Sequence, residues 1–172
     1  MPDGAKWIPM SEILTYEEIE RICREAVRIG ITRFKITGGE PLVRKGCADL
    51  IRMIRQIPGT EEVTMTTNGV LLGENLEDLL AAGLDAVNIS LDTLNPEHYN
   101  SLTGGCHVDR NPSDGNLEAV LRGMRKAQKQ AGISVKVNCV LMHQTREELL
   151  ALAELALSLI HISAPTRLGM IS

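Results

Sequence analysis

Apolar and polar positions along this chain follow two different periodicities. Six segments favour helices, through apolar residues at helical spacing or through flanking caps: 16–29, 48–56, 76–82, 96–102, 117–130 and 146–156. Four segments have the short β-branched or alternating pattern of strands: 32–36, 61–66, 85–90 and 134–140. Because the strands alternate with helices, we predict an α/β protein with a parallel sheet and right-handed crossovers.

The spacing of the strands indicates how many repeats are present. They begin near positions 32, 61, 85 and 134, which gives about four contiguous βα units. Four units make half of an eight-unit barrel, or most of a partial barrel. An open flavodoxin-like sheet is the main alternative, and the spacing alone does not exclude it. Segment 103–115 is rich in Gly, Pro, Asp and Asn and is predicted to be a loop.

Polar residues follow the predicted strands at the point where each strand ends. The first strand leads into Thr37-Gly38-Gly39-Glu40-Pro41, the second into Thr66-Thr67-Asn68-Gly69 and the third into Ser90-Leu91-Asp92, and Asn138 lies near the end of the fourth. Adjacent glycines let a backbone approach a ligand closely. Barrel-type α/β proteins build their active sites at this edge of the sheet. We therefore predict a ligand site there.

Composition narrows the classes of function. The 172 residues suffice for one domain or for part of a larger one. A formal net charge of −4 and an aromatic content of 2% argue against nucleic-acid binding, which uses basic surfaces and stacking rings. No apolar run reaches the roughly 20 residues of a membrane span, and the first residues lack the pattern of a signal peptide.

The cysteines predict a reducing environment. They form no CxxC pair and suggest no disulfide framework: Cys23, Cys47, Cys106 and Cys139. Cys23 and Cys139 are predicted to be small core residues, and Cys47 and Cys106 to lie in looser surroundings. We expect a cytoplasmic location. The four histidines are predicted to be solvated: His98, His107, His143 and His161. Asp85 and Asp92 are predicted to be surface or capping groups.

With TGGEP at 37–41, TTNG at 66–69 and NISLD at 88–92 in this order, the chain resembles the radical S-adenosylmethionine (SAM) enzyme family. Within that family it is most similar to the members that act on GTP in molybdenum-cofactor synthesis. The resemblance runs from Met1 to about Ala156 and includes Ile8-Pro9 and Val135-Lys136-Val137-Asn138. It implies a partial (β/α) barrel and radical chemistry on GTP.

The resemblance assigns binding roles to seven residues and a catalytic role to none. Four are expected at SAM: Gly38, Gly39, Glu40 and Ser90. Three are expected at GTP: Lys35, Thr66 and Lys136. Gly39 matches the glycine that contacts the methionine amino end of SAM, with Gly38 and Glu40 shaping that edge. Lys35 stands where family members often have an arginine, so it keeps the charge but loses the bidentate fork.

The resemblance also implies a [4Fe–4S] cluster held by a CxxxCxxC loop, which this chain lacks. In the family that motif ends one residue before a Met-Pro like Met1-Pro2. The cysteines present cannot replace it at their spacings. We therefore assign no metal ligand and expect the chain alone to be inactive, as a fragment of a cyclising enzyme.

The two ends of the chain lead to an expectation about domains. We expect a partial barrel domain at 1–156 and a non-native read-through tail at 157–172, where the helical periodicity is lost and Pro165 occurs. Half a barrel would leave strand edges unpaired and one apolar sheet face partly uncovered, which favours aggregation.

Two alternatives stay open from the sequence. One is a different radical SAM enzyme, such as a peptide- or haem-modifying relative. The other is a cluster-free barrel that binds a nucleotide or a partner subunit. The resemblance further implies an electron donor and a downstream pterin-forming protein as partners, and neither nucleic acid nor a membrane.

Overall fold

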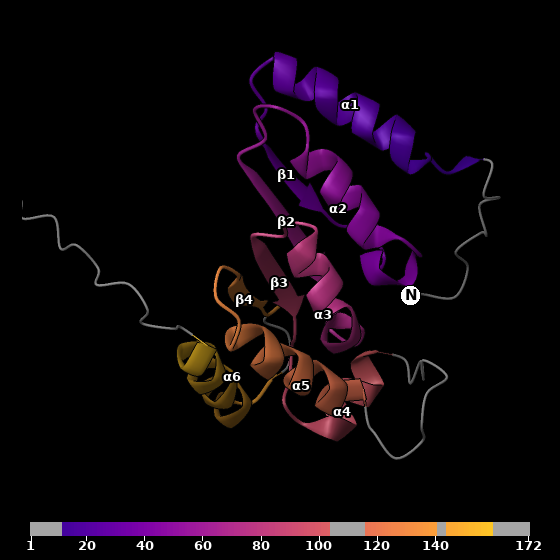
Figure 1. The fold of residues 1–172 in the computed structure, drawn as a ribbon. Coiled ribbons are helices and arrows are strands. Elements are labelled where there is room, and N and C mark those ends of the chain that lie inside the picture. The colour runs from indigo at the N-terminus through magenta and orange to yellow at the C-terminus, as the bar shows by residue number, and fades with distance from the viewer. Residues whose placement is uncertain (1–11, 104–115, 141–143, 160–172) are drawn as a thin grey trace, which may run out of the picture.

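The structure is a computed structural model that describes residues 12–103, 116–140 and 144–159. Figure 1 shows its helices and strands along the chain. The strands are β1 (Arg33–Ile36), β2 (Glu62–Thr67), β3 (Ala86–Ser90) and β4 (Ser134–Asn138). The helices are α1 (Tyr16–Arg28), the 3-10 helix η2 (Pro41–Val43), α2 (Cys47–Arg55), α3 (Leu72–Ala81), α4 (Pro96–Leu102), α5 (Asn116–Gln128) and α6 (Arg146–Leu159). Within these ranges no helix is long and apolar enough to cross a membrane.

Three sequence expectations fall outside the described residues. They are the loop at 104–115, the Met1-Pro2 opening and the part of the expected tail at 160–172. Helix α6 continues to Leu159, three residues beyond the boundary expected at Ala156.

The four described strands form one sheet in the order β1-β2-β3-β4, and each neighbouring pair is parallel. A flavodoxin-like sheet would place β1 between β2 and β3 and so break this sequential order. Sequential order with right-handed crossovers puts the connecting helices on one face of the sheet, as in a barrel. The prediction of a partial barrel with four βα units is confirmed, and the described strands exclude the flavodoxin-like alternative.

Local signals set the helix boundaries. Before α1, Thr15 Oγ1 accepts a hydrogen bond from Glu18 N at 3.2 Å, and Glu18 Oε2 accepts one from Thr15 N at 2.8 Å. This is a capping box, which satisfies two amides at the helix start. Helix α3 begins at Leu72, four residues before the predicted Leu76. The first turn of α3 is not predicted because segment 73–75 interrupts the apolar pattern. Leu72 nevertheless lies one helical turn from Leu76 and is equally buried.

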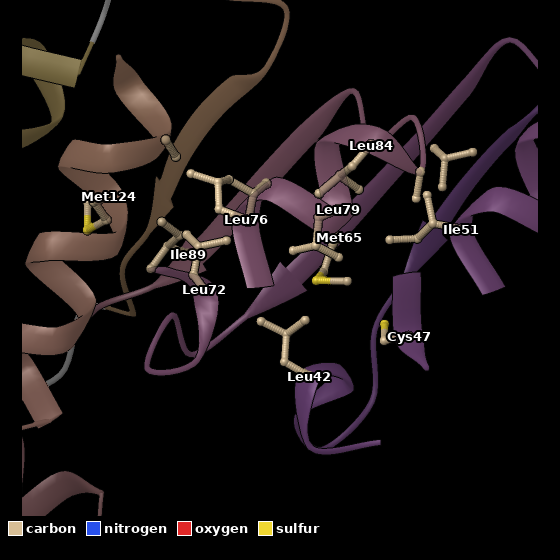
Figure 2. Close-up of a cluster of buried hydrophobic side chains, with 14 of the residues drawn as sticks. Leu42, Cys47, Ile51, Met65, Leu72, Leu76, Leu79, Leu84, Ile89 and Met124 are labelled. Atoms are coloured by element: carbon tan, nitrogen blue, oxygen red, sulfur yellow. The ribbon is translucent and has the colours of Figure 1, made fainter. Parts of the chain in front are cut away.

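The core lies between the helices and one face of the sheet. Met65 of β2 and Ile89 of β3 point to this side and are fully buried. Figure 2 shows Leu72 and Leu76 of α3 beside Ile89, and Met124 on α5. Aliphatic side chains of this size contribute about 1.5–3 kcal/mol each when fully buried. An aliphatic core can therefore hold the helices on the sheet with few aromatic rings.

Two glycines set the spacing between α3 and α5. A β-carbon at Gly123 would lie 3.0 Å from Gly73 N and 3.3 Å from Leu72 Cβ. The first of these atoms belongs to the backbone, which cannot rotate away as a side chain can. Close contact of the two helices over the sheet thus depends on the missing side chain at Gly123.

The opposite face of the sheet is largely polar. Side chains alternate along a strand, and the register brings one polar set to this face: Lys35, Thr64, Thr66, Asn88, Ser90, Ser134, Lys136 and Asn138. Ala86 is an apolar residue in the same rows. The expectation of a partly uncovered apolar face is therefore wrong, because the large apolar strand residues point to the helices. In the described part of the chain, β1 and β4 are the edge strands.

An ion pair fastens the amino-terminal edge of the sheet. Arg55, the last residue of α2, donates Nη1 and Nη2 to the two carboxylate oxygens of Asp85 at 3.0 and 3.1 Å. Asp85 Oδ2 also accepts a hydrogen bond from Val63 N at 2.7 Å. Asp85 is thus a half-buried clamp between α2, β2 and β3, at the end of the strands opposite to the predicted ligand site.

Candidate functional site

The candidate site begins with the loop after β1. Gly38 and Gly39 form an exposed bend, and η2 follows at Pro41. Nothing lies within 4 Å of the position where a side chain would begin at Gly38. The backbone is therefore open to a ligand at this bend, as the sequence predicts. Contact of Gly38 and Gly39 with SAM stays a prediction.

Glu40 joins this loop to the end of β2. Its Oε1 accepts hydrogen bonds from Thr67 Oγ1 at 2.7 Å and from Leu42 N at 3.1 Å, and its Oε2 accepts one from Asn68 N at 2.7 Å. Thr67 Oγ1 in turn accepts a hydrogen bond from Gly69 N at 3.0 Å. Three bonds to the protein fix the carboxylate. The role of Glu40 at SAM stays a prediction.

The polar face of the sheet brings the other predicted residues together in three rows. Thr66 and Lys136 share one row, with Asn88 between them. Ser90 lies in the next row towards the strand ends, opposite Asn138. Lys35 lies one row in the other direction, opposite Thr64. Strands lie about 4.8 Å apart and rows about 6.6 Å apart, so the four predicted residues lie within about 16 Å of one another in the sheet.

Two cations on this face have no carboxylate partner in the part of the chain that the structure describes. Lys35 and Lys136 are exposed and form neither an ion pair nor a side-chain hydrogen bond among the described residues. Arg33, two residues from Lys35, pairs instead with Glu61 at 3.4 Å and with Glu62 at 4.0 Å. The face is therefore locally positive in a chain of formal net charge −4. Such ammonium groups attract phosphates and other anions.

Asn88 is not among the residues that the sequence analysis assigns to a ligand, yet it lies in the same row as two of them. It belongs to the NISLD motif that carries the family resemblance. The alternation in β3 contained the signal, because Val87 and Ile89 are core residues and their neighbour must face the other way. The register of β3 against β2 and β4, which the sequence does not show, places Asn88 between Thr66 and Lys136.

A second carboxylate orders the loops beyond β3 and β4. Glu148 Oε1 accepts a hydrogen bond from Thr93 Oγ1 at 2.8 Å and lies 2.8 Å from His98 Nδ1, while Oε2 accepts one from Thr145 N at 2.9 Å. The Thr145 amide, the Thr93 hydroxyl and His98 lower the pKa of Glu148 to about 2. His98, predicted to be solvated, is half-exposed but engaged with Glu148. The other three histidines lie outside the described residues: His107, His143 and His161.

The described cysteines do not fit an iron–sulfur cluster. Cys23 and Cys47 are buried, Cys139 is half-buried, and all three are free thiols. Burial raises the pKa of each, that of Cys47 to about 11, whereas a cluster needs thiolates. Cys47 was expected in looser surroundings, and that expectation is wrong. In the ranges that the structure describes, no group of three His, Cys, Asp or Glu is placed to hold a metal. Cys106 lies outside them.

Four parallel strands in sequential order define a partial βα barrel, and polar residues lie at the carboxyl ends of these strands. In barrels of this kind ligands bind at that end. Residues 4–156 match the family model of the Radical SAM superfamily, and the chain belongs to that superfamily.

Curated relatives share substantial identity with the chain. A GTP 3′,8-cyclase from Peptoclostridium acidaminophilum is 45% identical over 131 residues, which are 76% of this chain and 38% of that protein. Proteins of the same name from Pelotomaculum thermopropionicum and Petrotoga mobilis are 39% and 43% identical, over 92% and 82% of this chain. These matches cover 46% and 41% of the two proteins. The chain thus spans less than half the length of these relatives.

Proposed function

We propose that this chain is the part of a GTP 3′,8-cyclase that holds SAM and GTP. That enzyme would convert GTP to (8S)-3′,8-cyclo-7,8-dihydroguanosine 5′-triphosphate in molybdenum-cofactor biosynthesis. The observation that carries the proposal is the shared row of Thr66 and Lys136, on the sheet face that also bears Lys35 and Ser90. Identity of 39–45% to proteins named GTP 3′,8-cyclase supports the choice of substrate.

In this proposal the two ligands occupy neighbouring levels of one site. SAM lies at the strand ends, against the Gly38-Gly39 bend and Ser90. GTP lies on the sheet, where the Lys136 ammonium group faces phosphate, the Thr66 hydroxyl supplies a hydrogen bond and Lys35 contacts the nucleotide from the other edge strand. When bound, SAM supplies the radical chemistry of the superfamily. The residues of this chain hold the two molecules next to each other in a fixed orientation. This positioning is their contribution to the reaction rate.

The cluster belongs elsewhere in this proposal. The described cysteines do not fit it, so we place its ligands outside these 172 residues. The barrel part is 1–156, and 157–172 has no function. An electron donor and a downstream pterin-forming protein are partners under the same proposal. Three free thiols support a reducing, cytoplasmic location.

Titration calorimetry on the purified chain tests the binding half of the proposal. We expect saturable binding of GTP and weaker binding of ATP. Lys136→Ala should lower GTP affinity about 10- to 100-fold, the effect of losing one charged hydrogen bond of about 1.5–3 kcal/mol. Lys129→Ala removes an exposed lysine beyond the end of α5 and should change nothing. Absence of GTP binding by the unaltered chain would overturn the proposal.

A turnover assay tests whether this chain binds the ligands but lacks the cluster ligands. With GTP, SAM and a reductant under anaerobic conditions, the chain alone should form neither 5′-deoxyadenosine nor cyclic product. Product formation by the chain would show that it holds a cluster after all, and would contradict our placement of the cluster ligands.

A cluster-free nucleotide-binding protein is the second candidate, and burial of the cysteines favours it. The complete gene product, purified without oxygen, distinguishes the two. An iron–sulfur signal in electron paramagnetic resonance together with GTP turnover supports the cyclase. GTP binding without either supports the second candidate, and SAM cleavage that does not consume GTP points to a different radical SAM substrate.

A further inference from the structure

Asn88 occupies the centre of the row that carries the proposed function. It pairs with Thr66 of β2 on one side and with Lys136 of β4 on the other. Residue Asn88 is only 8% exposed, although it lies on the polar face of the sheet. A short polar side chain is therefore held between two residues that we assign to GTP.

The Asn88 amide has no hydrogen-bond partner among the described residues, in contrast to the comparable buried groups. Buried polar side chains in these ranges are Thr67, Asn88 and Thr93. Thr67 donates to Glu40 at 2.7 Å, and Thr93 donates to Glu148 at 2.8 Å. No fully buried side-chain nitrogen or oxygen among the described residues lacks a partner, so the unbonded amide atoms of Asn88 reach the open polar face. The bonding capacity of Asn88, two donors and one acceptor, is available to a ligand.

The chemistry of the row indicates which part of a nucleotide would lie at Asn88. Its hydroxyl, amide and ammonium groups span about 10 Å across three strands. Lys136 carries the only charge of the three, so the phosphate belongs at its end of the row. The neutral amide of Asn88 can both donate a hydrogen bond to a hydroxyl group and accept one from it. These are the groups of the ribose, which is joined to the phosphate.

We infer that Asn88 is a further substrate-binding residue, whose amide hydrogen-bonds a ribose hydroxyl of the nucleotide bound between Thr66 and Lys136. The inference rests on the proposed function for the identity of the nucleotide. It adds a contact that selects a ribonucleotide over a nucleotide without sugar hydroxyls.

Calorimetry with two nucleotides and matched variants of the 172-residue protein tests the inference. Asn88→Leu keeps the size of the side chain and removes its hydrogen bonds. It should lower affinity for GTP about 5- to 10-fold, the loss expected for one to two neutral hydrogen bonds. Affinity for 2′,3′-dideoxy-GTP should change less than about twofold, since the lost partner is absent from that ligand. Ser134→Ala, on the same face but one row further from the strand ends, should change neither affinity.

A spectroscopic measurement on the unaltered protein covers the case in which Asn88→Leu fails to fold. The side-chain amide signal of Asn88 in a ¹⁵N–¹H correlation spectrum should shift on addition of GTP. It should shift much less on addition of 2′,3′-dideoxy-GTP.

The outcomes separate this inference from the proposed function. If GTP binds the unaltered protein and Asn88→Leu equally well, the inference is overturned and the proposed function stands. If Asn88→Leu weakens both nucleotides equally, the ribose assignment is overturned. If the unaltered protein does not bind GTP, the proposed function fails and the inference fails with it.

Discussion

Replacing Glu40 with Gln tests whether its carboxylate fixes the loop after β1. The substitution keeps one oxygen, which can still accept from Thr67 Oγ1 and Leu42 N. It replaces Oε2 with an NH₂ group. In the native protein Oε2 accepts a hydrogen bond from Asn68 N at 2.7 Å, so in the variant two donors would face each other at this position. One charge-assisted hydrogen bond is therefore lost and a repulsive contact replaces it.

The expected magnitude follows from the kind of bond and its exposure. A hydrogen bond to a charged group contributes about 1.5–3 kcal/mol. The Asn68 amide is exposed, so water replaces part of the lost interaction. We expect Glu40→Gln to lower the free energy of unfolding by about 1.5 kcal/mol, at the lower end of that range. For a chain of this size the melting temperature should fall by about 3–6 °C.

Urea unfolding monitored by circular dichroism measures this loss. Glu25→Gln is the matched control, because it removes an exposed carboxylate that pairs with Arg28 at the end of α1. That pair should contribute no more than about 0.5 kcal/mol. Thr67→Val completes a double-mutant cycle with Glu40→Gln and should show coupling above about 0.5 kcal/mol. Equal destabilisation by Glu40→Gln and Glu25→Gln would refute the role of the Glu40 carboxylate in fixing the loop after β1.

Two further predictions concern the loops beyond β3 and the helix layer. The pKa of Glu148 is lowered from 4.5 to about 2, so the stabilisation from its ionised form is present above pH 4.5 and is lost as the pH falls from 4.5 towards 2. Acid titration of stability should therefore be steeper in the native protein than in Glu148→Gln over that range, and identical slopes would contradict the assignment. Gly123→Ala should destabilise by about 1–2 kcal/mol, because the clash with Gly73 N outweighs a helix-propensity gain of about 1 kcal/mol. Gly73→Ala, whose β-carbon would lie 3.4 Å from Gly123 Cα, is the control and should cost less in the same urea titration.

The elements were predictable because each has a local signal. The capping box at Thr15 and Glu18 fixes the start of α1 by chemistry that lies within four residues of sequence. Periodicity gave the strands within one or two residues, since one face of each strand is buried by helices. The start of α3 was missed because three residues after Leu72 interrupt the apolar pattern. Local patterns were therefore sufficient to predict the elements in which buried residues recur at regular intervals along the sequence.

The site was only partly predictable because it depends on register. Thr66 and Lys136 are 70 positions apart in sequence, and only the pairing of β2, β3 and β4 places them in one row. The same pairing brings Asn88 between them, which no local pattern could show. The bonds from Glu40 to Thr67 and Asn68 likewise join segments that lie 27 and 28 residues apart. Family resemblance supplied the names of several of these residues but not their arrangement.

The distribution of polar residues also changes the expectation for folding of this half-barrel. The large apolar residues of the strands are covered by helices, so the face opposite the helices exposes hydroxyl, amide and ammonium groups instead. Such a face needs no partner to stay in water, and the aggregation risk moves to the strand edges. Edge strand β1 carries Arg33 and Lys35, and edge strand β4 carries Lys136. Charged residues on edge strands oppose edge-to-edge pairing. Binding measurements on the isolated chain are therefore a physically reasonable first experiment.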